Sequence, residues 1–132
     1  MNTDLRPQAG SPLLYGDVTE KILSAAFKVL NTLGTGLLEK VHEKALSLEL
    51  MKNGCKVENQ KLFHLAYEGI IVGDCLADIV VDGKVIVECK AVSLLDAVHE
   101  AQIMNYLKAS GVRVGLLINF GRTKLQYKRF VV

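Results

Sequence analysis

The segment between Ala77 and Lys90 constrains the fold of this chain more than any other part of its sequence. Two apolar, β-branched runs lie on either side of Asp82-Gly83, and this pattern predicts an antiparallel hairpin. Each run also carries charged residues where apolar ones are expected. Because side chains alternate along a strand, Glu88 and Lys90 point to the same face of the predicted sheet.

The length of the turn decides whether Asp78 joins them. A two-residue turn would pair Asp78 with Val87 and put its carboxylate on the opposite face from Glu88. A three-residue Val81-Asp82-Gly83 loop, with its glycine left-handed, would pair Asp78 with Ile86 and put both carboxylates on one face. Glycine at the third loop position favours the second arrangement, so we expect a bulged hairpin.

Two carboxylates and a lysine would be expensive to bury among valine and isoleucine side chains unless an ion neutralised them. Hard divalent cations such as Mg²⁺ bind paired carboxylate oxygens. A cation in that position can lower the pKa of a bound water and offset the charge that develops on a phosphate, while a lysine positions or activates the water. The hairpin therefore carries the groups that a metal-dependent phosphodiesterase needs.

The rest of the chain alternates between helical and strand periodicity. Residues 1–16 contain both prolines and no apolar period, so we expect a flexible N-terminal leader followed by one domain over residues 17–132. Apolar residues at helical spacing predict helices over 17–33, 37–52 and 93–109. Period-two patterns predict short antiparallel strands between residues 55 and 90, divided at Glu68-Gly69, Gly73-Asp74 and Asp82-Gly83, and two final strands over 112–119 and 124–132. This order indicates an α/β fold.

Composition excludes several other classes of protein. Half of the residues are apolar and 23% are charged, which is typical of a soluble globular chain. No apolar run approaches the roughly 18 residues that suggest a membrane span, so we expect a cytoplasmic protein with no membrane partner. The cysteines lack CxxC spacing and the histidines are unclustered, so we expect buried thiols and no zinc site. These residues are Cys55, Cys75, Cys89, His42, His64 and His99.

The formal net charge is only +2, so any phosphate-binding surface must come from local clustering of basic residues. Such residues gather in the last two predicted strands and their connections: Arg113, Arg122, Lys124, Lys128 and Arg129. A solvated face is the commoner meaning of a cluster like this. Beside the carboxylates, it could instead bind a phosphate backbone.

The order of several motifs resembles a known family. Asp78 followed by Glu88-Cys89-Lys90 matches the D…(D/E)xK signature of the PD-(D/E)XK nuclease superfamily. Over roughly residues 17–131, the chain looks more specifically like the bacterial GxxExxY family within that superfamily. The further segments that carry this resemblance are Gly36-Leu37-Leu38-Glu39, Ala45-Leu46, Tyr67-Glu68-Gly69, Ala91, 102–107 and 115–121.

The resemblance implies a restriction-endonuclease-like core, in which helices flank a mixed central β-sheet. It implies that Asp78 and Glu88 are metal ligands together with the backbone carbonyl of Cys89. Lys90 would orient the attacking water or steady the scissile phosphate. Glu39 matches the extra acidic residue that this family places near the metal, although an acidic residue in a first helical turn is also favoured by the helix dipole.

Gln102 and Tyr106 resemble the Q-x-x-x-Y motif of the branch related to RecB-type exonucleases, and their spacing puts both on one helix face. They could equally be an interior hydrogen-bonded pair that supports the helix against the sheet. The chain also departs from the family pattern at two positions. His42 replaces the tyrosine that follows Glu39, and Ala77 replaces the proline of the superfamily signature.

These observations favour a Mg²⁺- or Mn²⁺-dependent nuclease that hydrolyses phosphodiester bonds in nucleic acid, with DNA ahead of RNA. The alternative is a nucleic-acid-binding or assembly module that keeps the nuclease fold with weak or no catalysis, which His42 and the modest net charge favour. A third hypothesis is a subunit that acts only with a partner or as a homo-oligomer. Substrate polarity, strand preference and sequence specificity have no signal in the sequence.

Overall fold

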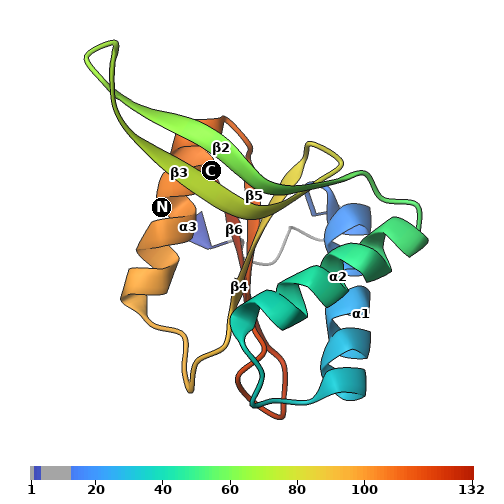
Figure 1. Ribbon diagram of the computed structural model, residues 1–132. Helices are drawn as coiled ribbons and strands as arrows, with labels where there is room; N and C mark the ends of the chain where they lie inside the picture. The colour runs from blue at the N-terminus through green and yellow to red at the C-terminus, as the bar shows by residue number, and fades with distance from the viewer. Residues whose placement is uncertain (1, 4–12) are drawn as a thin grey trace.

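A computed structural model describes residues 2–3 and 13–132 (Figure 1). From residue 16 onward, the order of helices and strands agrees with the sequence-based expectation, whereas the short strand β1 within the expected leader was not predicted. The elements are β1 (Asn2–Thr3), α1 (Gly16–Leu33), α2 (Glu39–Lys52), β2 (Val57–Tyr67), β3 (Ile70–Val81), β4 (Val85–Lys90), α3 (Ala97–Ser110), β5 (Val114–Asn119) and β6 (Gln126–Val131).

One six-stranded sheet, in the order β1-β6-β5-β4-β3-β2, forms the centre of the molecule. Its strand pairs are antiparallel except for β4 and β5, which are parallel and are connected through α3. Parallel neighbours require such a crossover, and the helix between residues 90 and 114 supplies it. The predicted α/β architecture, a mixed sheet flanked by helices, is confirmed.

Helices cover both faces of this sheet (Figure 1). On one face, α1 and α2 pack on Val85, Val87 and Cys89 of β4 and on alternate residues of β5. On the other face, α3 packs through Ile103, Met104 and Leu107 on Ile86 of β4 and on neighbouring strands. The alternation of side chains along β4 therefore divides the interior into two apolar layers.

The β3–β4 hairpin has the three-residue loop that the sequence favoured, but this loop lies one residue further along the chain, which shifts the pairing of the two strands by two residues. Val81 pairs with Val85, so the loop is Asp82-Gly83-Lys84 rather than 81–83. Asp82 and Gly83 have φ values of 53° and 66°, and the Lys84 N–H donates to the Val81 carbonyl at 2.9 Å. Asp82 tolerates the left-handed conformation, which moves the turn one residue along the chain. Asp78 therefore still lies on the same face of the hairpin as Glu88, and the positive φ of Gly83 is confirmed.

The expected short strands of residues 55–90 are fewer and longer in the structure. β2 has 11 residues and β3 has 12, and these two strands form a hairpin that extends beyond the helices (Figure 1). Gly73 and Asp74 were expected to end a strand. They instead pair with Leu65 and His64 inside the ladder, and a register irregularity between Leu65 and Ala66 takes up the disturbance without ending either strand.

The predicted leader falls largely on residues 1 and 4–12, which lie outside the described residues. Asn2 and Thr3 pair with β6 at an edge of the sheet, and α1 begins at Gly16. The boundary between a leader and a nuclease-like domain at residue 17 stays a prediction. None of the helices in the described ranges combines the length and the apolarity that crossing a membrane requires.

Candidate functional site

Asp78 and Glu88 lie opposite each other where β3 and β4 separate. The ladder between these strands runs from the turn to Ile79 and Val87. Beyond that point, side chains take the place of backbone acceptors: the Asp78 N–H donates to Glu88 Oε2 at 2.7 Å, and the Cys89 N–H donates to Asp78 Oδ2 at 2.9 Å. Both side chains are buried, with exposed fractions of 9% and 2%. The strands open here and the two carboxylates hold them together.

The burial of these two acids has an electrostatic consequence. Burial, and then the neighbouring charge of Asp78, raises the pKa of Glu88 to about 8, against the lowering effect of the Asp78 N–H and of Lys90. No ion pair within 4.0 Å involves either carboxylate among residues 13–132. Two close acids without a direct cationic partner favour binding of a cation.

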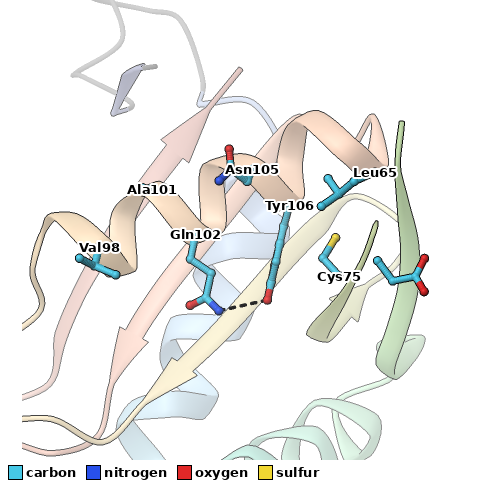
Figure 2. A pocket seen from close by; sticks show the side chains of 8 residues that line it. Leu65, Cys75, Val98, Ala101, Gln102, Asn105 and Tyr106 are labelled. Carbon is cyan, nitrogen blue, oxygen red and sulfur yellow. Dashed lines mark hydrogen bonds between the residues drawn. The ribbon is translucent and has the colours of Figure 1, made fainter. Parts of the chain in front are cut away.

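Lys90 lies two residues beyond Glu88 and is fixed by α3. Its Nζ donates to Gln102 Oε1 at 2.6 Å, and Gln102 Nε2 donates to the Tyr106 hydroxyl at 3.1 Å. Figure 2 shows Gln102 and Tyr106 side by side on one face of the helix. The predicted pair is therefore joined to Lys90 in one hydrogen-bonded chain.

A pocket of about 500 Å³ adjoins this chain, between α3 and the β2–β3 hairpin (Figure 2). Gln102 and Tyr106 contribute to its wall together with Leu65, Cys75 and Val98. Burial is the first cause that raises the pKa of the Tyr106 hydroxyl, and the charge of Glu88 is the second. Tyr106 therefore stays a neutral phenol at physiological pH.

α2 contributes acidic residues from the opposite face of the sheet. Glu39 is the first residue of this helix and is half-buried. Burial raises its pKa, Lys90 lowers it and Asp78 raises it again, so Glu39 lies within electrostatic range of both residues. This position fits a residue near the site and also fits an acid at a helix N-terminus.

Sequence reasoning missed Glu43 and Gln60. Glu43 is only 6% exposed, and its Oε2 accepts a hydrogen bond at 3.0 Å from Gln60 Nε2, which also lies 3.4 Å from Asp78 Oδ1. Burial, and then the charge of Asp78, raises the pKa of Glu43. The i,i+4 spacing of Glu39 and Glu43 was the one available signal, because it puts both on one helix face. Nothing in the sequence singled out Gln60.

The Cys89 side chain points away from the carboxylates, as expected. It is fully buried against α1 and α2, and burial raises the pKa of its thiol well above the usual value. The Lys90 carbonyl accepts from the Phe120 N–H at 2.7 Å, on the side of β5. Because successive peptides alternate along a strand, the Cys89 carbonyl points to the other side, towards Asp78. All three cysteines are free and buried.

His42 is part of the core beneath the site. Its ring stacks on Phe120 with centroids 4.8 Å apart and an interplanar angle of 10°. Its Nε2 lies 2.8 Å from the Gly34 carbonyl oxygen, while Nδ1 is buried without a hydrogen-bond partner. His42 therefore joins α2 to the end of α1 and to the end of β5.

Asn119 and Gly121 fix the chain that follows Lys90. The Asn119 side chain accepts from the Val92 N–H at 3.0 Å and donates to the Val92 carbonyl at 2.9 Å. A Cβ on Gly121 would lie 2.3 Å from that same carbonyl oxygen. The close approach requires glycine and restricts where Lys90 can lie.

The basic residues near the C-terminus do not share one surface. Lys128 forms an ion pair with Glu100 of α3 at 2.8 Å, whereas Arg129 donates to the Leu14 carbonyl before α1. These successive residues of β6 therefore point to opposite faces of the sheet. Arg122 donates to the Ser93 carbonyl, beside the segment that leads into α3.

The model of the PD-(D/E)XK nuclease superfamily matches residues 16–130. The chain belongs to this superfamily. Among solved structures, the crystal structure of SSO0001 is similar in fold, with a TM-score of 0.59 and 16% sequence identity. The match covers 89% of this chain and 59% of that chain, so this chain spans about three-fifths of that protein's length. No curated protein matches the sequence.

The superfamily implies a divalent metal, and the residues present fit one. Asp78 and Glu88 provide neighbouring buried carboxylates that no cation neutralises directly, and the Cys89 carbonyl points towards them. Within residues 2–3 and 13–132, no group of three or more His, Cys, Asp or Glu side chains is arranged to hold a metal. Mg²⁺ accepts backbone oxygen and water beside carboxylates, so two carboxylates are enough to begin its coordination set.

Proposed function

We propose that this protein is a Mg²⁺- or Mn²⁺-dependent nuclease of the GxxExxY family, with DNA as its substrate ahead of RNA. The observation that carries the proposal is the opening of β3 and β4 at Asp78 and Glu88, with Lys90 two residues away. A structural ion pair would bring the lysine to the acids. Here the neutral amide of Gln102 holds the Lys90 ammonium group beside the acids instead. The negative charge of the acids and the positive charge of the lysine therefore both stay available to a ligand.

In this proposal, Asp78, Glu88 and the Cys89 carbonyl are the metal ligands, and Glu39 contributes from α2. When bound there, the ion would supply a water of lowered pKa and offset charge on the phosphate. Lys90 orients the attacking water or steadies the scissile phosphate, and Gln102 holds the lysine in place. Tyr106 acts only through Gln102.

A second candidate is a nucleic-acid-binding or assembly module that keeps the fold and lacks useful catalysis. The observation that favours it is that the carboxylates are already engaged, because Glu88 Oε2 and Asp78 Oδ2 accept hydrogen bonds from backbone N–H groups.

We place the protein in the cytoplasm. It acts on nucleic acid either by itself, as a homo-oligomer or with a partner subunit.

Incubation of the purified protein with single- and double-stranded DNA and RNA separates the two functions. We expect degradation of at least one substrate with Mg²⁺ or Mn²⁺ and none with EDTA, because the chemistry depends on the ion. Binding of the same substrates by gel shift, without cleavage under any metal condition, would contradict the nuclease and support the binding module.

A further inference from the structure

Gln60 has a left-handed backbone conformation inside a β-strand. Among the described residues, four other than glycine have positive φ: Tyr15, Gln60, Glu68 and Asp82. Three of them lie at a helix start or in a turn. Gln60, with φ 49°, lies within β2, between the pairs Asn59↔Ile79 and Lys61↔Ala77. Strain of this kind persists only where the surroundings hold it.

The side chain of Gln60 shows what holds it. Its Nε2 lies 3.0 Å from Glu43 Oε2 and 3.4 Å from Asp78 Oδ1. An amide NH₂ has two donor hydrogens, so one group can serve both carboxylates. The remaining oxygens have other donors, because Glu43 Oε1 accepts from Lys40 Nζ and Asp78 Oδ2 accepts from the Cys89 N–H. Gln60 therefore faces the one oxygen of each acid that no other donor occupies.

Two buried acids so close would repel each other without this donor. Glu43 comes from α2 and Asp78 from β3, so repulsion would separate the helix from the strand at this point. The amide bridges them without adding a positive charge. A neutral bridge keeps the two carboxylates together and leaves Lys40, whose side chain is exposed, as the one cation that pairs with Glu43 among the described residues.

We propose that Gln60 is a positioning residue that sets Glu43 beside Asp78, so that each presents an oxygen to the divalent cation. This inference rests on the proposed function, and it adds Glu43 to the acids of that site. Gln60 acts through the two carboxylates and not on the substrate. Its effect is therefore on the affinity for the metal alone.

Calorimetric titration of the full chain with Mn²⁺, without nucleic acid, tests this proposal. We compare wild type with Gln60→Gly, which suits the positive φ, and with Gln60→Met, which keeps the length and the backbone strain but has no donor. Both variants should bind Mn²⁺ about tenfold or more weakly, since loss of a group that orients metal ligands commonly has this effect. Glycine relieves the strained backbone and methionine keeps it, so the proposal can still be tested if one of the two variants fails to fold.

Asn59→Ala is the matched control. Asn59 also joins β2 to α2, but its amide donates to Ser47 Oγ at 2.6 Å rather than to either acid. It should bind Mn²⁺ within about twofold of wild type. Wild-type affinity in both Gln60 variants, or equal weakening in all three variants, would overturn the role of Gln60 while leaving the nuclease intact. Absence of Mn²⁺ binding by wild type would overturn the proposed function itself.

Discussion

Asp78 and Glu88 each accept a hydrogen bond from the backbone of the facing strand, at positions that backbone carbonyls occupy in a regular antiparallel pair. The two side-chain acceptors satisfy the buried N–H groups of Asp78 and Cys89. The same arrangement brings two carboxylates into one desolvated space. Burial and repulsion between like charges favour the protonated form of Glu88. The burial of these two acids therefore costs stability, as we expect of a site that serves to bind a cation.

The raised pKa of Glu88 predicts that the protein loses stability as pH rises. The folded-state value of about 8 lies above the ordinary 4.5, so between these limits the folded protein holds a proton that the unfolded chain has released. The free energy of unfolding should therefore fall across this window, on the order of a few kcal/mol. Denaturant melts in EDTA at several pH values between 4.5 and 8 measure this fall.

Glu88→Gln is the matched variant, because its amide oxygen can still accept from the Asp78 N–H while the charge is gone. Glu39 and Glu43 also have raised pKa values and remain in the variant. The difference between the two proteins therefore isolates Glu88. Parallel pH profiles for wild type and variant would contradict the assigned pKa.

At the scale of elements, α3 determines where Lys90 points. The helix is fixed at both ends, by a capping box between Asp96 and His99 and by a left-handed Gly111. Gln102 lies in its middle, and its apolar neighbours Ile103 and Met104 are buried against the sheet. A rigid helix thus holds the acceptor of the Lys90 ammonium group.

Gln102→Leu should reduce cleavage by roughly 10²-fold while the fold is retained, because Lys90 loses its acceptor and small displacements at a reacting centre have large effects. Tyr106→Phe is the control, since its hydroxyl contacts Gln102 and not the lysine. It should have a much smaller effect. Cleavage rates measured beside thermal melts check this prediction. Lower melting temperatures with unchanged rates in both variants would make the pair a purely structural one.

At the scale of the whole molecule, most of the architecture could be predicted from periodicity. The apolar run of β4 and the helical spacing of the apolar residues in α3 are visible in the sequence, and a helix between two buried strands leads to the parallel β4–β5 pair. The alternation of side chains along the hairpin also placed Asp78 on the same face as Glu88. The register itself could not be predicted, because loops at 81–83 and 82–84 both put Asp78 on that face. The two loops differ only in whether Asp82 becomes left-handed.

Part of the candidate site could not be predicted for a different reason. Glu43 and Gln60 meet Asp78 only after α2 docks on β2, and long-range contacts of this kind leave no local pattern in one sequence. The length of β2 and β3 was missed because Gly73 indicated a break that pairing overrides. Gln60 is in addition a local exception, since its backbone conformation is one that glutamine rarely adopts.

Single-turnover cleavage by wild type and Glu88→Gln, with Mg²⁺ and the best substrate of the panel, tests the central claim most directly. The variant keeps the hydrogen-bond acceptor for the Asp78 N–H and loses the charge of the proposed metal ligand. We predict that it folds normally and that its cleavage rate falls by about 10³-fold or more, because a metal ligand acts on every step of the reaction. A folded Glu88→Gln protein that cleaves at the wild-type rate would contradict the assignment of this site.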